Sequence, residues 1–406
     1  MKVVVHDYAG HAFTAQLGRA LARFDDVEVL YLSFEGFDSP KGRVDPSEGD
    51  PETFSIRQLT IGQPVNKDNL AVRWLQQRKY ARILSDVILS ERPDFFLSSA
   101  PIEVQEAALS ACHKIGARFT FWVQDIHSEA IERILSNKSR LLGQLAGRYY
   151  RRKESSLLQR SDAVVTIAEE FRDLLSEPRW GLDVGHMEVV ENWANIADIP
   201  LLPRDNVWSA ANLRPNRPRI VYSGTLARKH NPDLLLELAR NLEADVYLFS
   251  QGSGADHVRE SAISEGLDNV IVRPWVSVED LPFMLASADI LFAVIEADAG
   301  IFSVPSKVLS YLAAGRPILA SIPSMNLAAA TVKRTGAGLV AEPNDIGALL
   351  SNARLLLNDP DQRKRMGAAG RAYAEETFDI NAISRQFKAI FLESTRSKNV
   401  RDTMRL

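Results

Sequence analysis

Short apolar runs alternate with longer stretches of helical period along this chain, and the alternation occurs in two successive series. The pattern is typical of strands and crossover helices in a parallel sheet. The first series predicts strands at 2–6, 27–32, 94–98, 118–123, 163–167 and 187–190. The second predicts strands at 219–223, 245–250, 269–273, 289–294, 317–320 and 338–341, with helices such as 232–242, 256–265, 306–314 and 345–357. We therefore expect an α/β chain with two Rossmann-like sheets.

The stretch between the two series, ENWANIADIPLLPRDNVWSAANLRPNRPR, has four prolines and little periodicity, as interdomain linkers do. A chain of 406 residues also exceeds what one core usually supports. We predict one domain over 1–195 and a second over 196–377, facing each other across a cleft. The last segment, about 378–406, has apolar residues at helical spacing, and we expect it to pack back on the first domain.

Composition restricts the class of protein. With 46% apolar residues, 25% charged residues and a net charge of -4, the chain is typical of globular proteins and lacks the basic excess of nucleic-acid binders. The single cysteine, Cys112, excludes an internal disulfide. The N-terminus MKVVVHDYAG is too polar for a signal peptide, and no apolar run approaches a membrane span. We expect a cytoplasmic protein.

Two motifs of the first series lie where predicted strands end. The first strand runs into HDYAGHAFTAQLGRALARF, where Gly10 precedes a helix whose free N–H groups can face an anion. A tight turn before a helix is the alternative. The strand FTFWV runs into QDIHSEA, which puts Gln124, Asp125 and His127 where open α/β sheets bind ligands. Alternatively, Asp125 or His127 caps the next helix.

In the second series, IVYSGTLARKHNPDLLLELA has small residues at a strand end, Gly224 and Thr225, followed by Arg228 and Lys229. Small residues allow close approach of the backbone, and the two cations supply charge, so the segment predicts a diphosphate site. A solvated basic loop is the alternative.

The segment DAGIFSVPSKVLSYLAAGRPILA is the most specific in the chain. Gly300 offers a flexible loop, and Ser306 can N-cap the helix that follows. Lys307 lies in the first turn, where the helix dipole disfavours a cation unless an anion is near. An exposed surface lysine is the alternative.

The triplet Asp359-Pro360-Asp361 resembles an acidic pair that holds a divalent cation, but its position after LLLN favours a helix end and a new N-cap. The histidines are scattered without ligand spacing, and we expect no metal.

Residues 133–160 carry eight basic side chains among leucines and tyrosines. This pattern predicts either a helix that lies on an anionic leaflet or a solvated helix face.

The segments HDYAGH, FWVQDIHSEA, VVENWAN, YSGTLARKHNP and VPSKVLSYLAAGRP occur in the order found in family 4 glycosyltransferases of the GT-B fold. The chain resembles this family over essentially its whole length. It resembles more narrowly the bacterial branch that builds O-antigen, colanic acid and capsule, which includes WbuB-like N-acetylfucosaminyltransferases. The resemblance implies retaining, metal-independent transfer from a nucleotide diphosphate sugar, usually UDP-linked. The sugar nucleotide is a substrate, held by the C-terminal domain, and a glycan or polyprenyl-linked acceptor binds mainly to the N-terminal domain.

Residue by residue, the resemblance places Gly10 near the sugar, Lys229 near the pyrophosphate, and Gly300 to Ser303 beneath the sugar and phosphates. The chain departs from the family at the two usual glutamates, where it has Phe302 and Ser310.

Gln124 stands where the wider family often has a histidine, with His127 nearby. Glu296 is the nearest glutamate upstream of Gly300, and we expect it to contact the sugar.

The resulting hypothesis is that Lys229, Arg228 and Lys307 stabilise the departing pyrophosphate. Asp125 or His127 orients the acceptor. The alternatives are a nucleotide-sugar 2-epimerase and a non-catalytic partner of an active transferase. Neither first strand is followed by GxGxxG, which argues against a dehydrogenase.

Overall fold

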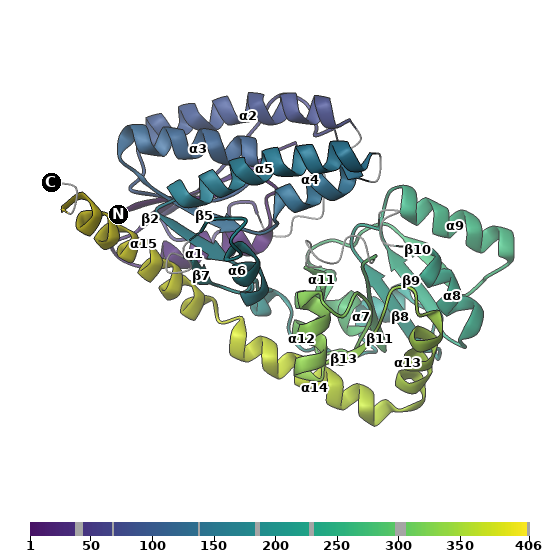
Figure 1. Cartoon of the computed structure of the whole chain (residues 1–406). Coiled ribbons are helices and arrows are strands. Elements are labelled where there is room, and N and C mark those ends of the chain that lie inside the picture. Colours follow the sequence, from purple (N-terminus) through teal and green to yellow (C-terminus); the bar gives the residue numbers. More distant parts are fainter. Residues whose placement is uncertain are drawn as a thin grey trace. The chain divides into compact units, whose positions relative to one another are not determined.

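A computed structural model of the chain describes residues 1–36, 44–66, 69–136, 139–182, 187–226, 231–296 and 306–403 (Figure 1). The chain divides into two compact units. Unit 1 comprises Met1–Glu191 and Ile380–Leu406, and unit 2 comprises Asn192–Asp379. Each unit is a parallel sheet with covering helices, so the predicted pair of α/β sheets is confirmed.

Unit 1 contains a seven-stranded sheet in the order β3-β2-β1-β4-β5-β6-β7. Its strands are β1 Lys2–Asp7, β2 Glu28–Phe34, β3 Phe54–Leu59, β4 Phe95–Ser99, β5 Arg118–Val123, β6 Ala163–Thr166 and β7 Met187–Val189. All the strands predicted for the first series are present, but β3 was missed. Its sequence FSIRQL forms an edge strand with three exposed polar side chains, so it lacks the continuous apolar run of a central strand.

The helices of unit 1 before residue 192 are α1 Ala12–Leu21, α2 Leu70–Glu91, α3 Ile102–Ile115, α4 His127–Ser136, α5 Arg140–Arg160 and α6 Glu169–Leu175.

The hairpin of α4 and α5 is unusually close-packed. A Cβ atom on Gly143 would lie 2.6 Å from the Ser136 amide nitrogen and 2.7 Å from the Glu132 carbonyl oxygen. Only glycine therefore lets the two backbones approach so closely.

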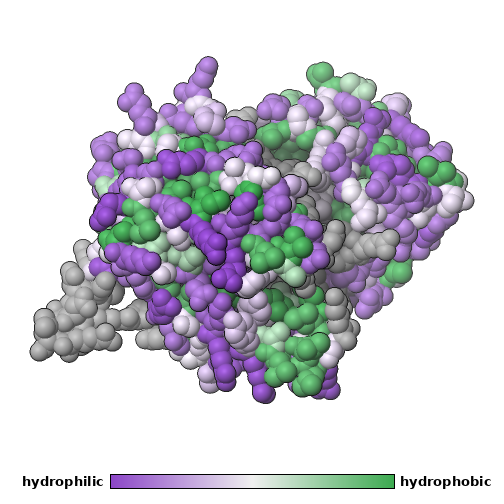
Figure 2. Space-filling model, turned by 90° about the horizontal axis from the view of Figure 1, so that it is seen from above, coloured by the Kyte–Doolittle hydropathy of each residue, from purple (hydrophilic) through white to green (hydrophobic). Residues whose placement is uncertain are grey.

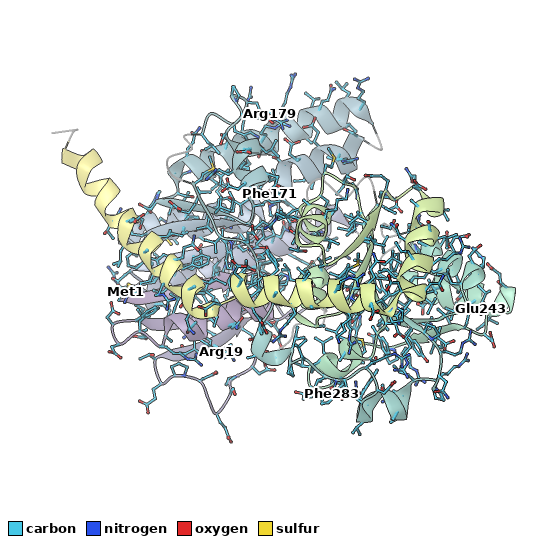
Figure 3. All side chains as sticks on the ribbon, turned by 90° about the horizontal axis from the view of Figure 1, so that it is seen from below. Met1, Arg19, Phe171, Arg179, Glu243 and Phe283 are labelled. Carbon is cyan, nitrogen blue, oxygen red and sulfur yellow. The ribbon has the colours of Figure 1, made fainter. Side chains whose placement is uncertain are left out.

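The long C-terminal helix α15, Ile380–Thr403, packs on unit 1 as predicted (Figures 1 and 3). Phe391 lies 5.4 Å from Phe95 of β4, and Phe387 lies 5.1 Å from Trp122 of β5, between ring centroids. The two phenylalanines are fully buried, so α15 covers part of the sheet.

Unit 2 contains a six-stranded sheet in the order β10-β9-β8-β11-β12-β13. Its strands are β8 Arg219–Ser223, β9 Asp245–Phe249, β10 Val270–Arg273, β11 Ile290–Val294, β12 Ile318–Ser321 and β13 Gly338–Ala341, as the second series predicts. Its helices are η2 Ile196–Asp198, α7 Val207–Asn212, α8 Asp233–Asn241, α9 Ser253–Glu265, α10 Leu281–Ala286, α11 Lys307–Ala313, α12 Leu327–Thr335, α13 Ile346–Asn358 and α14 Pro360–Thr377.

The predicted linker is partly structured. Asn206 and Ser209 form a reciprocal capping box that starts α7, which the sequence reading did not anticipate. Arg204 donates two hydrogen bonds of 2.9 Å to Asp289, next to β11, and so ties this segment to unit 2.

Asp359 ends α13 and its side chain accepts a 2.8 Å hydrogen bond from the amide of Gln362, which confirms the predicted helix end and new N-cap.

Candidate functional site

The strand order of both sheets reverses at one point, and ligands of open α/β sheets bind outside the carboxyl ends of strands at such a point. In unit 1 the reversal lies between β1 and β4, and in unit 2 it lies between β8 and β11. Most of the predicted site residues that the structure describes follow the strands at or next to these points.

In unit 2 the structure brings Gly224 and Lys307 together. Gly224 follows β8 with φ +113°, a conformation that favours glycine. A Cβ atom on Gly224 would lie 3.6 Å from both Cε and Nζ of Lys307, so the lysine reaches across to the end of β8. Lys307, the first residue of α11, therefore lies at the same site as the loop after β8, although the two are far apart in the sequence.

The amine of Lys307 has an unusual environment. Its Nζ lies 3.5 Å from the ring centroid of Tyr222, a cation–π contact with a buried ring. Among the ion pairs of the described residues, none involves Lys307. Burial lowers the pKa of this lysine to about 7. Lys307 is partly buried, so the alternative of an exposed surface lysine is wrong.

The tyrosines around Lys307 fix the backbone at the end of β8. The Ser223 amide donates to the Tyr311 hydroxyl of α11 at 3.0 Å, and the Tyr222 hydroxyl donates to the Thr225 carbonyl at 2.8 Å. Thr225 itself is exposed beside Gly224. The strand end and α11 are thus held in one arrangement by two buried phenols.

Other predicted residues of unit 2 are less informative. Glu296 follows β11, the neighbour of β8, at the reversal point. Ser306 occupies the N-cap position of α11 but makes no side-chain capping hydrogen bond. The remaining predicted residues, Arg228, Lys229, Gly300, Phe302 and Ser303, lie outside the described residues.

In unit 1 the loop with Gly10 is held by Asp7, a residue that the sequence reading missed. Gly10 has φ +73° and its amide bonds the Asp7 carbonyl at 3.2 Å, so it forms a tight turn before α1. The buried Asp7 carboxylate accepts hydrogen bonds from the amides of Ala9 and His11 and from the Thr14 hydroxyl, at 3.0, 2.6 and 2.8 Å. The sequence signal that could have identified Asp7 is a carboxylate at the end of the first strand, just before a glycine turn.

The electrostatics of Asp7 favour a permanent anion. Burial opposes its ionisation, but His11, whose Nδ1 lies 2.9 Å away, and the hydrogen bonds outweigh burial and lower the pKa to about 2. The imidazole of His11 is half exposed, so Asp7 holds an accessible histidine at the start of α1.

His127 is the first residue of α4 and lies near a second missed carboxylate, Glu154 of α5. The buried Glu154 side chain accepts 3.0 Å hydrogen bonds from the amides of His127 and Ser128. It thus occupies the helix start that Asp125 or His127 was suggested to cap. Glu154 is the single acidic residue in the basic stretch 133–160, which was the signal for it.

Glu154 also shapes the charge of His127. The His127 Nδ1 lies 3.8 Å from a Glu154 carboxylate oxygen. Burial opposes protonation of the imidazole, but Glu154 and then Asp125 outweigh burial and raise its pKa. Gln124 is partly buried and Asp125 is exposed. These two residues and His127 follow β5, at the same carboxyl edge of the sheet as the Gly10 loop, which follows β1.

The described residues contain no group of three or more histidine, cysteine, aspartate or glutamate side chains placed to hold a metal ion. Among the helices in the described part of the chain, none is both long and apolar enough to cross a bilayer.

Two family models match the chain. Residues 9–193 match the glycosyl transferase 4-like domain, and residues 205–373 match glycosyl transferases group 1. The two matches correspond to most of units 1 and 2, and residues 1–8, 194–204 and 374–406 lie outside them.

Curated relatives agree. The chain is 26% identical over 307 residues to the "Putative colanic acid biosynthesis glycosyl transferase WcaI" of Escherichia coli K12, which covers 73% of each chain. It is 24% identical over 365 residues to the "Probable glycosyltransferase WbjE" of Pseudomonas aeruginosa, which covers 86% of this chain and 84% of the relative.

Solved structures share the fold. Sucrose-phosphate synthase from Thermosynechococcus elongatus matches with a TM-score of 0.76 at 16% identity, over 98% of this chain and all of that one. HepE of Anabaena, in complex with UDP and glucose, matches with a TM-score of 0.70 at 14% identity, over 97% and 100%. A "putative UDP-N-acetylglucosamine 2-epimerase" from Listeria monocytogenes matches with a TM-score of 0.60 at 15% identity, over 97% of each. The chain has the GT-B fold and belongs to the group 1 glycosyltransferases, with a family 4-like N-terminal domain.

Proposed function

We propose that this protein is a retaining, metal-independent glycosyltransferase that moves a sugar from a UDP-linked donor to a glycan or polyprenyl-linked acceptor in surface polysaccharide biosynthesis. The observation that carries the proposal is the amine of Lys307, which lies against Gly224 at the reversal point of unit 2.

The chemistry of this site suits a departing diphosphate. When the bond between the anomeric carbon and the phosphate oxygen breaks, negative charge develops on that oxygen. A preorganised cation stabilises such charge far better at a site shielded from water than in bulk solvent. Lys307 is partly buried, and none of its contacts among the described residues is with a carboxylate, so it can supply this charge where other transferases use a metal. Arg228 and Lys229 would add to it.

Unit 2 would hold the donor. Gly224 leaves room for close approach by phosphates, and Thr225 and Glu296 follow the two strands at the reversal point. The loop with Gly300, Phe302 and Ser303 would lie beneath the sugar. The solved complex of HepE with UDP and glucose supports a UDP-linked donor on this fold.

Unit 1 would hold the acceptor. Gly10 would lie near the sugar, and Asp125, His127 and Gln124 would orient the acceptor hydroxyl. The hydroxyl attacks from the face that the diphosphate leaves, which retains the anomeric configuration. Its proton passes to the departing phosphate oxygen, and no protein base is needed.

The relative WcaI, whose name assigns it to colanic acid biosynthesis, supports a role in polysaccharide biosynthesis, and WbjE supports glycosyl transfer. A cytoplasmic location follows from the use of nucleotide sugars, and residues 133–160 would contact the inner face of the membrane.

The direct experiment is an assay with chelator present, in which a panel of nucleotide sugars is offered with soluble and polyprenyl-linked acceptors. Lys307→Ala is expected to lower kcat roughly 100-fold, the size of effect seen when one charge-stabilising donor is removed. Lys364→Ala, an exposed lysine of α14, is the matched control. Wild-type turnover in Lys307→Ala, or a product with inverted configuration, would refute the proposal.

A nucleotide-sugar 2-epimerase is the second candidate, because the Listeria structure shares the fold. An epimerase would convert the donor without any acceptor, so incubation with donor alone separates the two activities. A non-catalytic partner, suggested by Phe302 and Ser310 at the places of the usual glutamates, would bind donor without turnover across the whole acceptor panel.

A further inference from the structure

A cavity of about 610 Å³ lies within unit 2, beside helix α14. Its lining comes from the predicted linker segment, from the turn between α11 and β12, and from α14 itself. Helix α14 belongs to the yellow ribbon in the foreground of Figure 3, and it packs against α11. A cavity of this volume is large enough to hold a small organic ligand.

The cavity lies at the end of the unit 2 sheet opposite to the candidate donor site. Asp289 comes directly before β11, Arg316 comes two residues before β12, and both line the cavity. Gly224 and Glu296, by contrast, follow the carboxyl ends of β8 and β11. The five residues of β11 span roughly 16 Å. A ligand in this cavity would therefore lie apart from a donor held at the carboxyl ends of the strands.

Four arginines among the described residues line this cavity, and two of them are neutralised within the protein. Arg204 donates two hydrogen bonds of 2.9 Å to Asp289. Arg371 donates a 2.7 Å hydrogen bond to Glu375. The lining that the structure describes includes no third carboxylate. The other two arginines, Arg316 and Arg363, are therefore left without a carboxylate of their own.

The charge of Arg316 is not compensated. Its Nη2 donates a 3.0 Å hydrogen bond to the Leu202 carbonyl, while its buried Nε has no hydrogen-bond partner among the described residues. The ion pairs in that part of the chain do not include Arg316. Burial lowers the pKa of its guanidinium more than Asp289 raises it. A partly buried cation without a counter-charge costs free energy, and a bound anion would offset this cost.

Arg363 supplies a second guanidinium to the cavity. Its Nη1 donates hydrogen bonds of 2.6 and 2.8 Å to the carbonyls of Leu356 and Leu357, which fix its orientation. Its Nη2 lies 3.9 Å from an Asp289 carboxylate oxygen, beyond hydrogen-bond distance, and Arg204 already binds that carboxylate. A guanidinium held in this way loses little conformational freedom when it binds an anion.

The two guanidiniums suit a phosphate group. Arginines recognise phosphate through their planar N–H forks. A phosphoryl group on an organic molecule carries about 1.5 to 2 negative charges near pH 7, which matches two arginines. Aliphatic side chains also line the cavity, among them Leu201, Pro317 and Ala372. They offer an apolar surface to the organic part of such a ligand.

The surface seen in Figure 2 gives a contrast. Figure 2 views the molecule from the direction opposite to Figure 3, and it shows apolar patches set among hydrophilic side chains. Such a mixture is usual on folded proteins and indicates no particular ligand. The cavity beside α14 is more specific, because it combines an enclosed volume with two uncompensated cations.

We propose that this cavity is a second ligand site of the protein, in which Arg316 and Arg363 bind the phosphate group of a small organic phosphate monoester. Leu201 and Pro317 contact the organic part of the ligand. The inference goes beyond the proposed function, because it requires neither a sugar donor nor turnover.

The test titrates the full chain with phenyl phosphate and with inorganic phosphate by isothermal titration calorimetry, in the presence of chelator. Every protein in the titration carries Lys307→Ala, so that the amine of the candidate donor site takes no part in binding. Phenyl phosphate joins a phosphate to an apolar group and contains no nucleotide. The Lys307→Ala parent is expected to bind one equivalent of phenyl phosphate, at least as tightly as it binds inorganic phosphate.

Two variants of this parent change the cavity. Arg316→Gln removes an uncompensated cation, and Ala368→Glu puts a carboxylate on the wall of the cavity at an exposed position of α14. The matched controls are Arg365→Gln, on the same helix but outside the lining, and Ala210→Glu at an exposed position of α7. Because Ala368 is exposed, Ala368→Glu should keep the melting temperature of the parent even if Arg316→Gln lowers it.

Both cavity variants should bind phenyl phosphate at least about tenfold more weakly than the parent, the size of effect expected from one charge-assisted hydrogen bond. The two controls should bind like the parent. Absence of binding to the parent, or cavity variants that bind like the controls, would overturn the proposal. Binding of inorganic phosphate without binding of phenyl phosphate would mean an adventitious ion only, and would overturn it as well.

The proposed function is tested separately, by UDP binding and sugar transfer in the protein with Lys307 intact. A transferase whose cavity binds no phenyl phosphate refutes only this inference. A chain that binds phenyl phosphate through Arg316 but transfers no sugar refutes only the proposed function.

Discussion

At the scale of single residues, the candidate site is defined by charges held in costly environments. Lys307 carries an amine beside an aromatic ring at the start of a helix, Asp7 is a buried anion in a turn, and Glu154 is a buried acidic side chain at another helix start. Each arrangement opposes stability unless neighbouring groups or a ligand offset it. Such residues are candidates for function on physical grounds.

Replacing Lys307 with methionine is expected to stabilise the ligand-free protein on the order of 2 kcal/mol at pH 7. The pKa of Lys307 falls from 10.5 unfolded to about 7 folded, so the unfolded state binds the extra proton between these values. Wild-type stability therefore rises with pH across this window, and the advantage of Lys307→Met should shrink toward pH 10. Calorimetry at several pH values measures this.

Lys364→Met, which removes an exposed lysine, should show no such pH dependence and is the control. If Lys307→Met gains nothing at pH 7, or its gain does not change with pH, then Lys307 is not an uncompensated buried cation.

Replacing Glu154 with glutamine should lower the pKa of His127, because the interaction with Glu154 raises this pKa and offsets the lowering by burial. The raised pKa means that the pair stabilises the fold below about pH 6.5 and that this stabilisation disappears as the pH rises through the folded value. An NMR titration of the His127 ring measures the shift. Glu106→Gln, which removes a carboxylate paired with Lys153 instead, should leave His127 unchanged.

At the scale of elements, periodicity located the strands because buried parallel strands read as continuous apolar runs. It missed β3, whose polar residues face solvent at a sheet edge, and α7, whose six residues are too short to show a helical period. In the site, Gly224 and Lys307 could be chosen from their local sequence. Asp7 and Glu154 act through the amides of other residues, a relation that becomes visible only once the backbone is placed.

The α4–α5 hairpin gives a prediction at this scale. Gly143→Ala would put a methyl group against backbone atoms of Glu132 and Ser136, which cannot move as a side chain can. We expect a loss of about 2 kcal/mol or more in the free energy of unfolding, measured by denaturant titration. Gly347→Ala in α13, where the nearest atom is a side-chain oxygen at 3.5 Å, should be neutral or stabilising by up to about 1 kcal/mol. Equal effects of both changes would contradict the close approach.

At the scale of the whole molecule, α15 makes unit 1 discontinuous in sequence, because the chain returns to it after completing unit 2. Phe387→Ala removes a buried ring from the contact with Trp122 and should destabilise unit 1 by about 3–5 kcal/mol. Leu392→Ala, on the same helix but 45% exposed, should cost far less. Thermal unfolding followed by tryptophan fluorescence distinguishes them, and similar losses would mean that α15 does not cover the sheet as described.

The central claim is that unit 2 binds a UDP-linked donor through Lys307 without a metal. A ligand that binds only the folded state raises its melting temperature. The most direct measurement is therefore a thermal shift with UDP in the presence of chelator, on the wild type and on Lys307→Ala. The account predicts a clear rise for the wild type, no added effect of magnesium, and little or no rise for Lys307→Ala. No response of the wild type to UDP, or an equal response of both proteins, would contradict it.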